Sequence, residues 1–255
     1  MEEERLLEAA ADLGYRLMVC GAEIYRVEES VNRLLRAYGM EQGEVFAIYN
    51  CVIVSCVTRE GRPLCQMRRV GAHGVDLDRM EAYNDLCRRA CREVPPPQEF
   101  RAALEEVARR RTYGPRVLAA AYFAGAFAFT LFFGGNLRDG LCGGLCGLLI
   151  YGCLQFMERF NANVFFRNIA ASAVSALAAL LLVGCGLGVN RSWITIGAFM
   201  TLTPGIALTN TMRDIMAGDF VAGTSKLVEA LLTATAIALG TGLAIGLVRM
   251  LGGDV

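Results

Sequence analysis

The spacing of hydrophobic positions changes twice along the first part of the chain. They first recur every three or four residues, then give way to β-branched and aromatic runs with a turn at Gly61, and finally return to helical spacing on both sides of three consecutive prolines. This order predicts an α+β region with a small antiparallel sheet. The predicted elements are one or two helices over 4–38, strands over 45–49, 52–58 and 64–70, and helices over 76–93 and 98–111.

Long uncharged stretches dominate the rest of the chain. The first 113 residues hold 17 of the 25 basic and 19 of the 25 acidic residues, which leaves 8 and 6 for the remainder. Several apolar stretches there approach the roughly 20 residues that a helix needs to cross a bilayer. We therefore predict an α-helical polytopic membrane protein, with a cytosolic α+β domain over 1–113 and about five transmembrane helices over 114–255. The predicted spans are Val117–Phe133, Leu137–Met157, Val164–Val189, Trp193–Met212 and Gly223–Val248.

Basic residues near the predicted spans are divided unevenly between the two sides of the membrane. Eight lie on the side where the chain enters the first span, and Arg138, Arg191 and Arg249 lie on the other. Because the more basic side faces the cytoplasm, we predict a plasma-membrane protein with a cytoplasmic N-terminus. An odd number of spans then predicts a C-terminus outside. The first twenty residues agree, since they lack the basic segment and cleavage site of a secretory signal.

The fourth predicted span is unusually polar. Near its middle, Pro204 removes a backbone hydrogen bond and Gly205 permits an unwound turn. The half-helix that follows would offer free N–H groups to a carboxylate or another small polar solute. The alternative is a kinked helix whose threonines hydrogen-bond to their own backbone. The candidate substrate-binding residues are Thr203, Pro204, Gly205, Thr209, Asn210 and Arg213.

Acidic residues after this break are candidates for proton coupling. They are Asp214, Asp219 and Glu229, of which Glu229 is predicted to lie deepest in the membrane. Ionisable groups at membrane depth usually face a cavity or one another, and this favours a functional role. The alternatives are a solvated loop for the two aspartates and a structural ion pair between Glu229 and Lys226.

Other kinds of chemistry have little support in the sequence. With one histidine, ten scattered cysteines and no CxxC motif, the cysteines are better interpreted as small packing residues than as metal ligands. No nucleotide-binding loop or nucleophile elbow is present, which argues against an ATP-driven pump. We therefore expect no enzyme activity, no metal, no cofactor and no nucleic-acid partner. The expected partners are a small-molecule substrate and the lipid bilayer.

Two further patterns favour structural roles. The segment GAEIYRVEES (21–30) places Glu23, Arg26 and Glu28 on a helix, which we interpret as an exposed surface with local ion pairs. Glycines four residues apart predict close helix packing in three of the spans. Those pairs are Gly143/Gly147, Gly184/Gly188 and Gly242/Gly246.

Three stretches taken together resemble the threonine/serine exporter family. They are GAEIYRVEES (21–30), FAIYNCVIVSCVTREGRPLCQMRRV (46–70) with VDLDRMEAYNDLCRR after it, and TPGIALTNTMRDIMAGDFVAG (203–223). The resemblance implies proton-driven export of threonine and serine, or of small dicarboxylates such as succinate. It also implies that the chain is similar to the larger half of a split exporter, which works with a second, smaller membrane subunit.

The resemblance assigns residues to a membrane motif but no catalytic residue. The matching positions are Pro204, Gly205, Thr209, Asn210, Arg213, Asp214, Gly218 and Asp219. If the chain ends outside, a five-span partner would be inverted relative to it, and we hypothesise a pseudo-two-fold unit with the substrate site at the interface. A homo-oligomer is left open. The alternatives are a membrane-anchored enzyme and a regulatory membrane protein that binds a ligand without transporting it.

Overall fold

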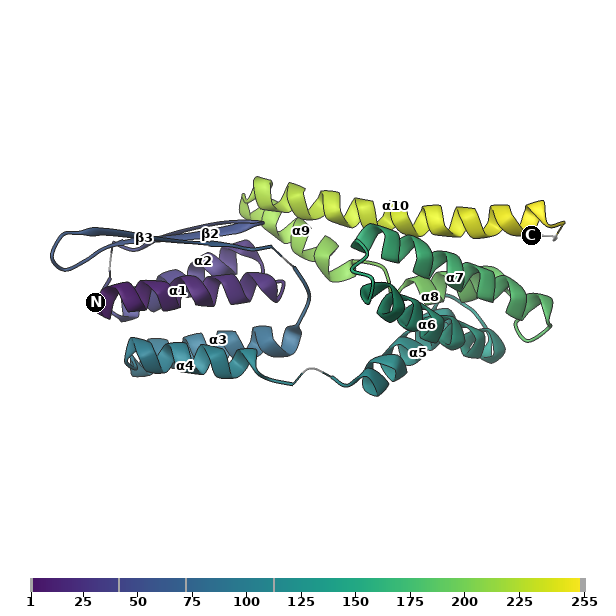
Figure 1. Cartoon of the computed structure of the whole chain (residues 1–255), viewed down its shortest axis with the longest axis horizontal. Coiled ribbons are helices and arrows are strands. Elements are labelled where there is room, and N and C mark those ends of the chain that lie inside the picture. The colour runs from purple at the N-terminus through teal and green to yellow at the C-terminus, as the bar shows by residue number, and fades with distance from the viewer. Residues whose placement is uncertain (1, 41, 72, 112, 253–255) are drawn as a thin grey trace. The chain divides into compact units, whose positions relative to one another are not determined.

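The structure is a computed structural model that describes residues 2–40, 42–71, 73–111 and 113–252. The chain forms two compact units (Figure 1). The first unit combines residues 1–111 with 205–228, and the second combines 112–204 with 229–255. A segment from the second half of the sequence therefore completes the N-terminal unit.

The first unit confirms the predicted α+β architecture. Its three strands form an antiparallel sheet in the order β1-β2-β3, with Val54 of the central strand opposite Val45 and Gln66. Figure 1 shows the sheet on one side of α1 and α2, with α3 and α4 on the other side. The elements are α1 (Glu2–Val19), α2 (Ile24–Ala37), β1 (Glu44–Ile48), β2 (Cys51–Val57), β3 (Pro63–Arg69), α3 (Leu77–Glu93), α4 (Pro97–Ala108), α9 (Gly205–Ala217) and the start of α10 (Phe220–Met250).

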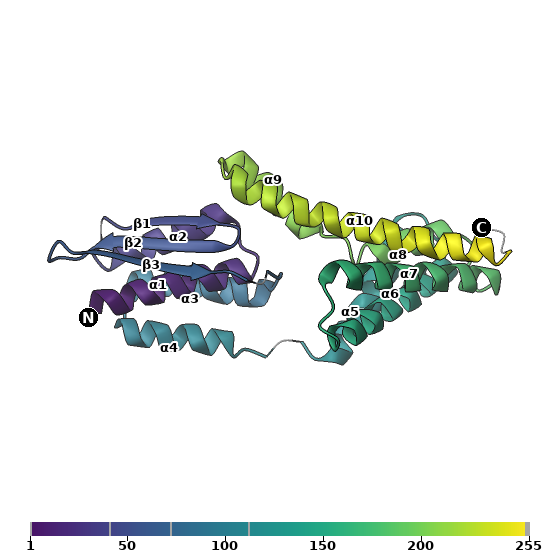
Figure 2. The same ribbon diagram turned by 45° about the horizontal axis from the view of Figure 1, so that its top comes forward.

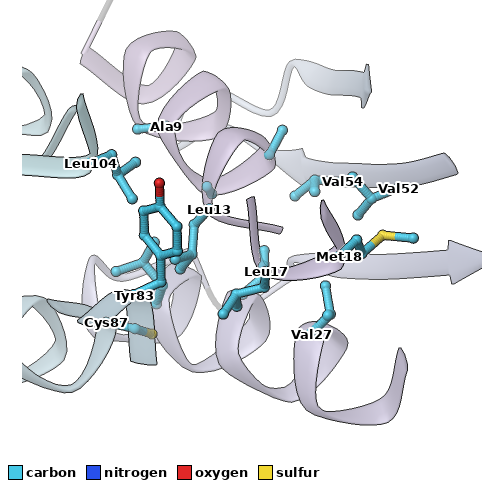
Figure 3. Close-up of a cluster of buried hydrophobic side chains, with 14 of the residues drawn as sticks. Ala9, Leu13, Leu17, Met18, Val27, Val52, Val54, Tyr83, Cys87 and Leu104 are labelled. Atoms are coloured by element: carbon cyan, nitrogen blue, oxygen red, sulfur yellow. The ribbon is translucent and has the colours of Figure 1, made fainter. Parts of the chain in front are cut away.

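The core of this unit follows from the two periodicities of its sequence. The strand β2 lies in the middle of the sheet that covers α1 and α2 (Figure 2). Alternate residues of β2 point to these helices, so Val52 and Val54 are fully buried (Figure 3). Leu13 and Leu17 of α1 are buried one helical turn apart. Burial of each such side chain stabilises the fold by about 1.5–3 kcal/mol relative to leaving it exposed to water. The helix predicted over 76–93 is also confirmed as α3, and Asp76 caps its start, since the Asp76 carboxylate accepts the Arg79 N–H at 3.0 Å.

The second unit is helical. Four helices of the described chain are long and apolar enough to cross a membrane, namely α5, α6, α7 and α10. The predicted fourth span, Trp193–Met212, is not one helix: α8 ends at Phe199 and α9 begins at Gly205. Proline lacks a backbone N–H and disfavours helical geometry in the residue before it, so the predicted break is confirmed. The new elements are α5 (Pro115–Phe132), α6 (Leu137–Glu158), α7 (Val164–Gly184) and α8 (Arg191–Phe199).

Glycines allow close helix packing in the second unit, but not always at the predicted positions. A Cβ on Gly147 would lie 2.5 Å from the Tyr122 carbonyl oxygen, so the pair at 143/147 is confirmed as a packing site. Gly242 and Gly246 have nothing within 4 Å of such an atom. The close approach of α10 occurs instead at Gly240, where a Cβ would lie 2.2 Å from the Ile169 carbonyl oxygen.

Candidate functional site: a buried ionic junction

The turn between α1 and α2 forms one side of the site. Gly21 adopts a positive φ of 88°, and a Cβ there would lie 2.6 Å from the Gly74 carbonyl oxygen, so the position requires glycine. Glu23 then occupies the N-cap position of α2 without capping it through its side chain. Its carboxylate is therefore available to other partners, and the first N–H groups of α2 need an acceptor from elsewhere.

Asp214 of α9 supplies that acceptor. Its Oδ1 accepts the Ile24 N–H at 3.2 Å, at the first residue of α2, where a carboxylate also interacts favourably with the helix dipole. Its Oδ2 accepts from the Lys226 ammonium group at 2.7 Å. Asp214 is fully buried and the Lys226 side chain is only 11% exposed. Each charge has therefore lost most of its hydration and is compensated by this contact.

Glu23 lies between two guanidinium groups. Arg213 Nη1 donates to Oε1 at 2.7 Å, and Arg26 Nε lies 3.0 Å from Oε2. The Glu23 side chain is 7% exposed, whereas those of Arg213 and Arg26 are about half-exposed. One buried carboxylate thus holds two arginines, one from α2 and one from α9.

A third contact joins the same two segments. The Asn210 side-chain amide donates to the Gly21 carbonyl oxygen at 3.0 Å. Asn210, Arg213 and Asp214 are spaced i, i+3 and i+4, and they therefore share one face of α9. We call the whole cluster the ionic junction, which comprises Gly21, Glu23, Arg26, Asn210, Arg213, Asp214 and Lys226.

The two candidate threonines make hydrogen bonds to their own backbone. The hydroxyl group of Thr203 donates to the Phe199 carbonyl oxygen and that of Thr209 donates to the Gly205 carbonyl oxygen, both at 3.0 Å. These bonds are the ones expected of a kinked helix whose threonines hydrogen-bond to their own backbone, the alternative to a substrate site. Both side chains are exposed, so their hydroxyl oxygens remain open to a second partner. Pro204 lies in the break before α9, directly ahead of Gly205.

The remaining candidate acids differ in their surroundings. Burial and the nearby Asp214 carboxylate raise the pKa of Asp219, against the opposing effect of Lys226. The pKa of Glu28 is also raised, first by burial and then by Asp219, although a hydrogen bond from the Ala47 N–H acts in the opposite direction. Glu229 is exposed on α10, in the part of that helix assigned to the second unit.

The interpretation of Glu23 as an exposed surface residue was wrong. Its partner Arg213 lies 190 positions away, and no local pattern could identify that contact. The available signal was indirect: Glu23 directly precedes the buried residues Ile24, Val27 and Val31 on the apolar face of α2. Lys226 likewise pairs with Asp214 in the structure, whereas the sequence suggested only Glu229 as its partner.

Comparison with known proteins settles the family. The model of the ThrE threonine/serine exporter family matches residues 8–248. The chain belongs to this family. It is also 24% identical over 255 residues to the threonine/serine exporter of Corynebacterium glutamicum, an alignment that covers 96% of this chain and 52% of the relative. The chain therefore spans about half the length of that curated relative. No solved structure matches.

Membership of the exporter family implies a multi-pass membrane protein. The match includes both the α+β region and the helices of the second unit. Within the residues that the structure describes, no group of three or more His, Cys, Asp and Glu side chains is placed to hold a metal ion.

Proposed function

We propose that this exporter-family chain is a secondary-active exporter subunit for threonine and serine. The observation that carries the proposal is the family match from residue 8 to residue 248, which extends through both units. The relative from Corynebacterium glutamicum bears the name of a threonine/serine exporter, and this supports the substrate class. Transport also accounts for several apolar helices and for a helix break in a polar segment.

The substrate carboxylate would bind at the start of α9. The first N–H groups of this helix have no partner within it, and its positive end attracts an anion. Thr203, Pro204, Gly205, Thr209 and Asn210 would shape this region, with Arg213 as the cationic partner. Because Arg213 already holds Glu23, we propose that the substrate carboxylate exchanges with the Glu23 carboxylate. Such an exchange keeps the arginine paired throughout.

Proton coupling would use an acid that also meets the substrate amine. Asp214, Asp219 and Glu229 are the candidates, and an entering proton would compete with the departing amine for the same carboxylate. This competition produces antiport. The raised pKa of Asp219 supports this role, because its carboxylate binds a proton at a higher pH than a solvated aspartate does.

A second, smaller membrane subunit would complete the exporter. The support is the resemblance of residues 21–30, 46–70 and 203–223 to the larger half of a split exporter. The N-terminus would lie in the cytoplasm, and the side of the C-terminus depends on whether the segment containing α8 and α9 crosses the bilayer. A crossing places the C-terminus outside and an inverted partner beside it, whereas four crossings return it to the cytoplasm. A C-terminal reporter distinguishes the two, and a cytoplasmic signal would contradict the inverted arrangement.

The central experiment measures efflux of labelled threonine, serine and succinate. Cells would express this chain alone, the chain with a second subunit encoded beside it, or neither. We expect threonine and serine efflux that needs both chains and that collapses when the proton gradient is dissipated. Efflux of succinate alone would identify a dicarboxylate exporter. Binding without efflux of any of the three would instead favour a regulatory protein.

A further inference from the structure

A pocket in the first unit lies apart from the predicted substrate residues. It lies between α2 and α3 and has a volume of about 550 Å³. Small-molecule sites in proteins usually have volumes of about 300–1,000 Å³, so this one is large enough for a metabolite. Every residue that lines it belongs to the N-terminal α+β region.

The lining of this pocket is strongly basic. It includes four arginines, one carboxylate and Tyr25. The arginines are Arg26, Arg33, Arg88 and Arg92, and the carboxylate is Glu29. Four like charges around one cavity repel one another, and an anion in the cavity would relieve that repulsion.

The carboxylates present do not neutralise this set of charges. Glu29 pairs with Arg33 at 2.6 Å, but both side chains are more than half-exposed and such pairs contribute little. Arg88 pairs with the exposed Asp85 at 3.3 Å. Arg92 has no ion-pair partner among the residues that the structure describes. Guanidinium groups bind phosphate and carboxylate groups through two parallel hydrogen bonds, and this geometry suits a ligand with several such groups.

Arg26 connects the pocket to the ionic junction. It lines the pocket, and its Nε also lies 3.0 Å from Oε2 of Glu23, whose other oxygen holds Arg213. An anion that attracts Arg26 would weaken its contact with Glu23. The Glu23 carboxylate would then interact with Arg213 alone. Occupancy of the pocket is thereby coupled to the segment that carries the predicted substrate residues.

We propose that this pocket binds a small soluble polyanion, either a phosphate ester or a polycarboxylate, and that Arg26 transmits its binding to the ionic junction. The site would make the transporter responsive to a metabolite without that metabolite being transported. The binding itself does not depend on which solute the protein exports, so it can be tested without transport.

The test is calorimetric titration of the purified full-length chain in neutral detergent, at fixed ionic strength, with pyrophosphate and with citrate as probes. We expect saturable binding of at least one probe at concentrations on the order of 1 mM or below. R33Q/R88Q should weaken binding about tenfold or more, because it removes two charge-assisted contacts. The matched control R36Q/R89Q removes the same charge from the same two helices outside the lining, and it should retain affinity within about twofold. Equal losses in both variants, or no saturable binding to the wild type, would overturn the site.

The link through Arg26 has its own readout. E23Q releases Arg26 from its carboxylate partner, so we expect E23Q to bind the probe several-fold more tightly than the wild type. Unchanged affinity in E23Q would overturn the link. Loss of threonine efflux with retained probe binding would instead bear only on the proposed transport function.

Discussion

Arg213 Nη1 and Glu23 Oε1 lie 2.7 Å apart although the two residues are separated by 190 positions in the sequence. The contact joins the segment after the helix break to the first turn of α2. The carboxylate is nearly buried while the guanidinium is half-exposed. When the pair is broken, water can replace the partner of Arg213 but not that of Glu23, so the loss of the contact costs more free energy at Glu23. The buried Glu23 carboxylate of the N-terminal region therefore holds α9 in place through Arg213.

Neutralising Glu23 should destabilise the first unit. Glu23→Gln keeps the shape of the side chain but leaves two arginines without their carboxylate, and we expect a loss of about 1–3 kcal/mol in the free energy of unfolding. Cys20 offers a probe, because burial raises the pKa of its thiol to about 11 and protects it from alkylation in the folded state. Thermal unfolding is followed by mass-spectrometric detection of alkylated Cys20.

The control for this prediction is an exposed pair. Glu60→Gln breaks the contact with Arg62, in which both side chains are more than two-thirds exposed, and it should leave the unfolding midpoint nearly unchanged. A cycle with Arg213→Gln should show that the two single losses do not add. Strict additivity would mean that the pair makes no energetic contribution of its own.

Asp214 and Lys226 should behave as a mutually dependent pair. Asp214→Asn leaves a nearly buried ammonium group without its ion-pair partner, and Lys226→Met leaves a buried carboxylate with only the Ile24 N–H. We expect each to cost about 3 kcal/mol, and the double variant to be more stable than either single one. The Cys20 alkylation assay measures all three. A double variant whose loss equals the sum of the single losses would contradict the pairing.

The stability of the first unit should depend on the protonation of Asp219. Its folded-state pKa lies above the ordinary value, chiefly because of burial and then because of Asp214, so the folded unit binds this proton more tightly than the unfolded chain. The contribution of the protonated group is complete below the unfolded-state pKa and is lost as the pH rises through the raised folded-state pKa. Asp219→Asn removes this loss. Its stability relative to the wild type should therefore increase with pH over that window.

Cys20 alkylation compared by mass spectrometry at a series of pH values, with equal reagent exposure corrected for thiolate content, tests this sign. Thr224→Val serves as the control, since it changes an exposed, non-ionisable side chain in the first turns of α10, which begins directly after Asp219. Its offset from the wild type should stay constant with pH. A relative stability of Asp219→Asn that falls with rising pH would reverse the assignment.

Two neighbouring glycines of α10 should respond differently to a methyl group. Gly240→Ala places its Cβ against the Ile169 carbonyl oxygen, which is fixed in a helix, and we expect a loss of about 1–3 kcal/mol. Gly242→Ala has open space around it and should be nearly neutral. The single tryptophan of the chain, Trp193 in α8, reports unfolding of the second unit by fluorescence. Equal effects of the two substitutions would show that α10 does not pack as closely as the structure has it.

The sequence by itself determined the features that arise from neighbouring residues. Helical and strand periodicity identified the α+β region, the polar side chain of Asp76 identified a helix start, and the missing N–H of Pro204 identified the break between α8 and α9. Each of these depends on contacts within a few residues, so the local pattern was sufficient.

Only the tertiary structure decided which polar residues meet. The sequence placed Asn210, Arg213 and Asp214 on one face of a helix but could not say that this face contacts Gly21, Glu23 and Ile24. In the same way, it could not distinguish Gly240 from Gly242, because glycine spacing is the same whether or not another helix approaches. The physical reason is that a buried charge needs an oppositely charged partner to offset its loss of hydration. Both the partner and the segments that exclude water come from far away in the sequence.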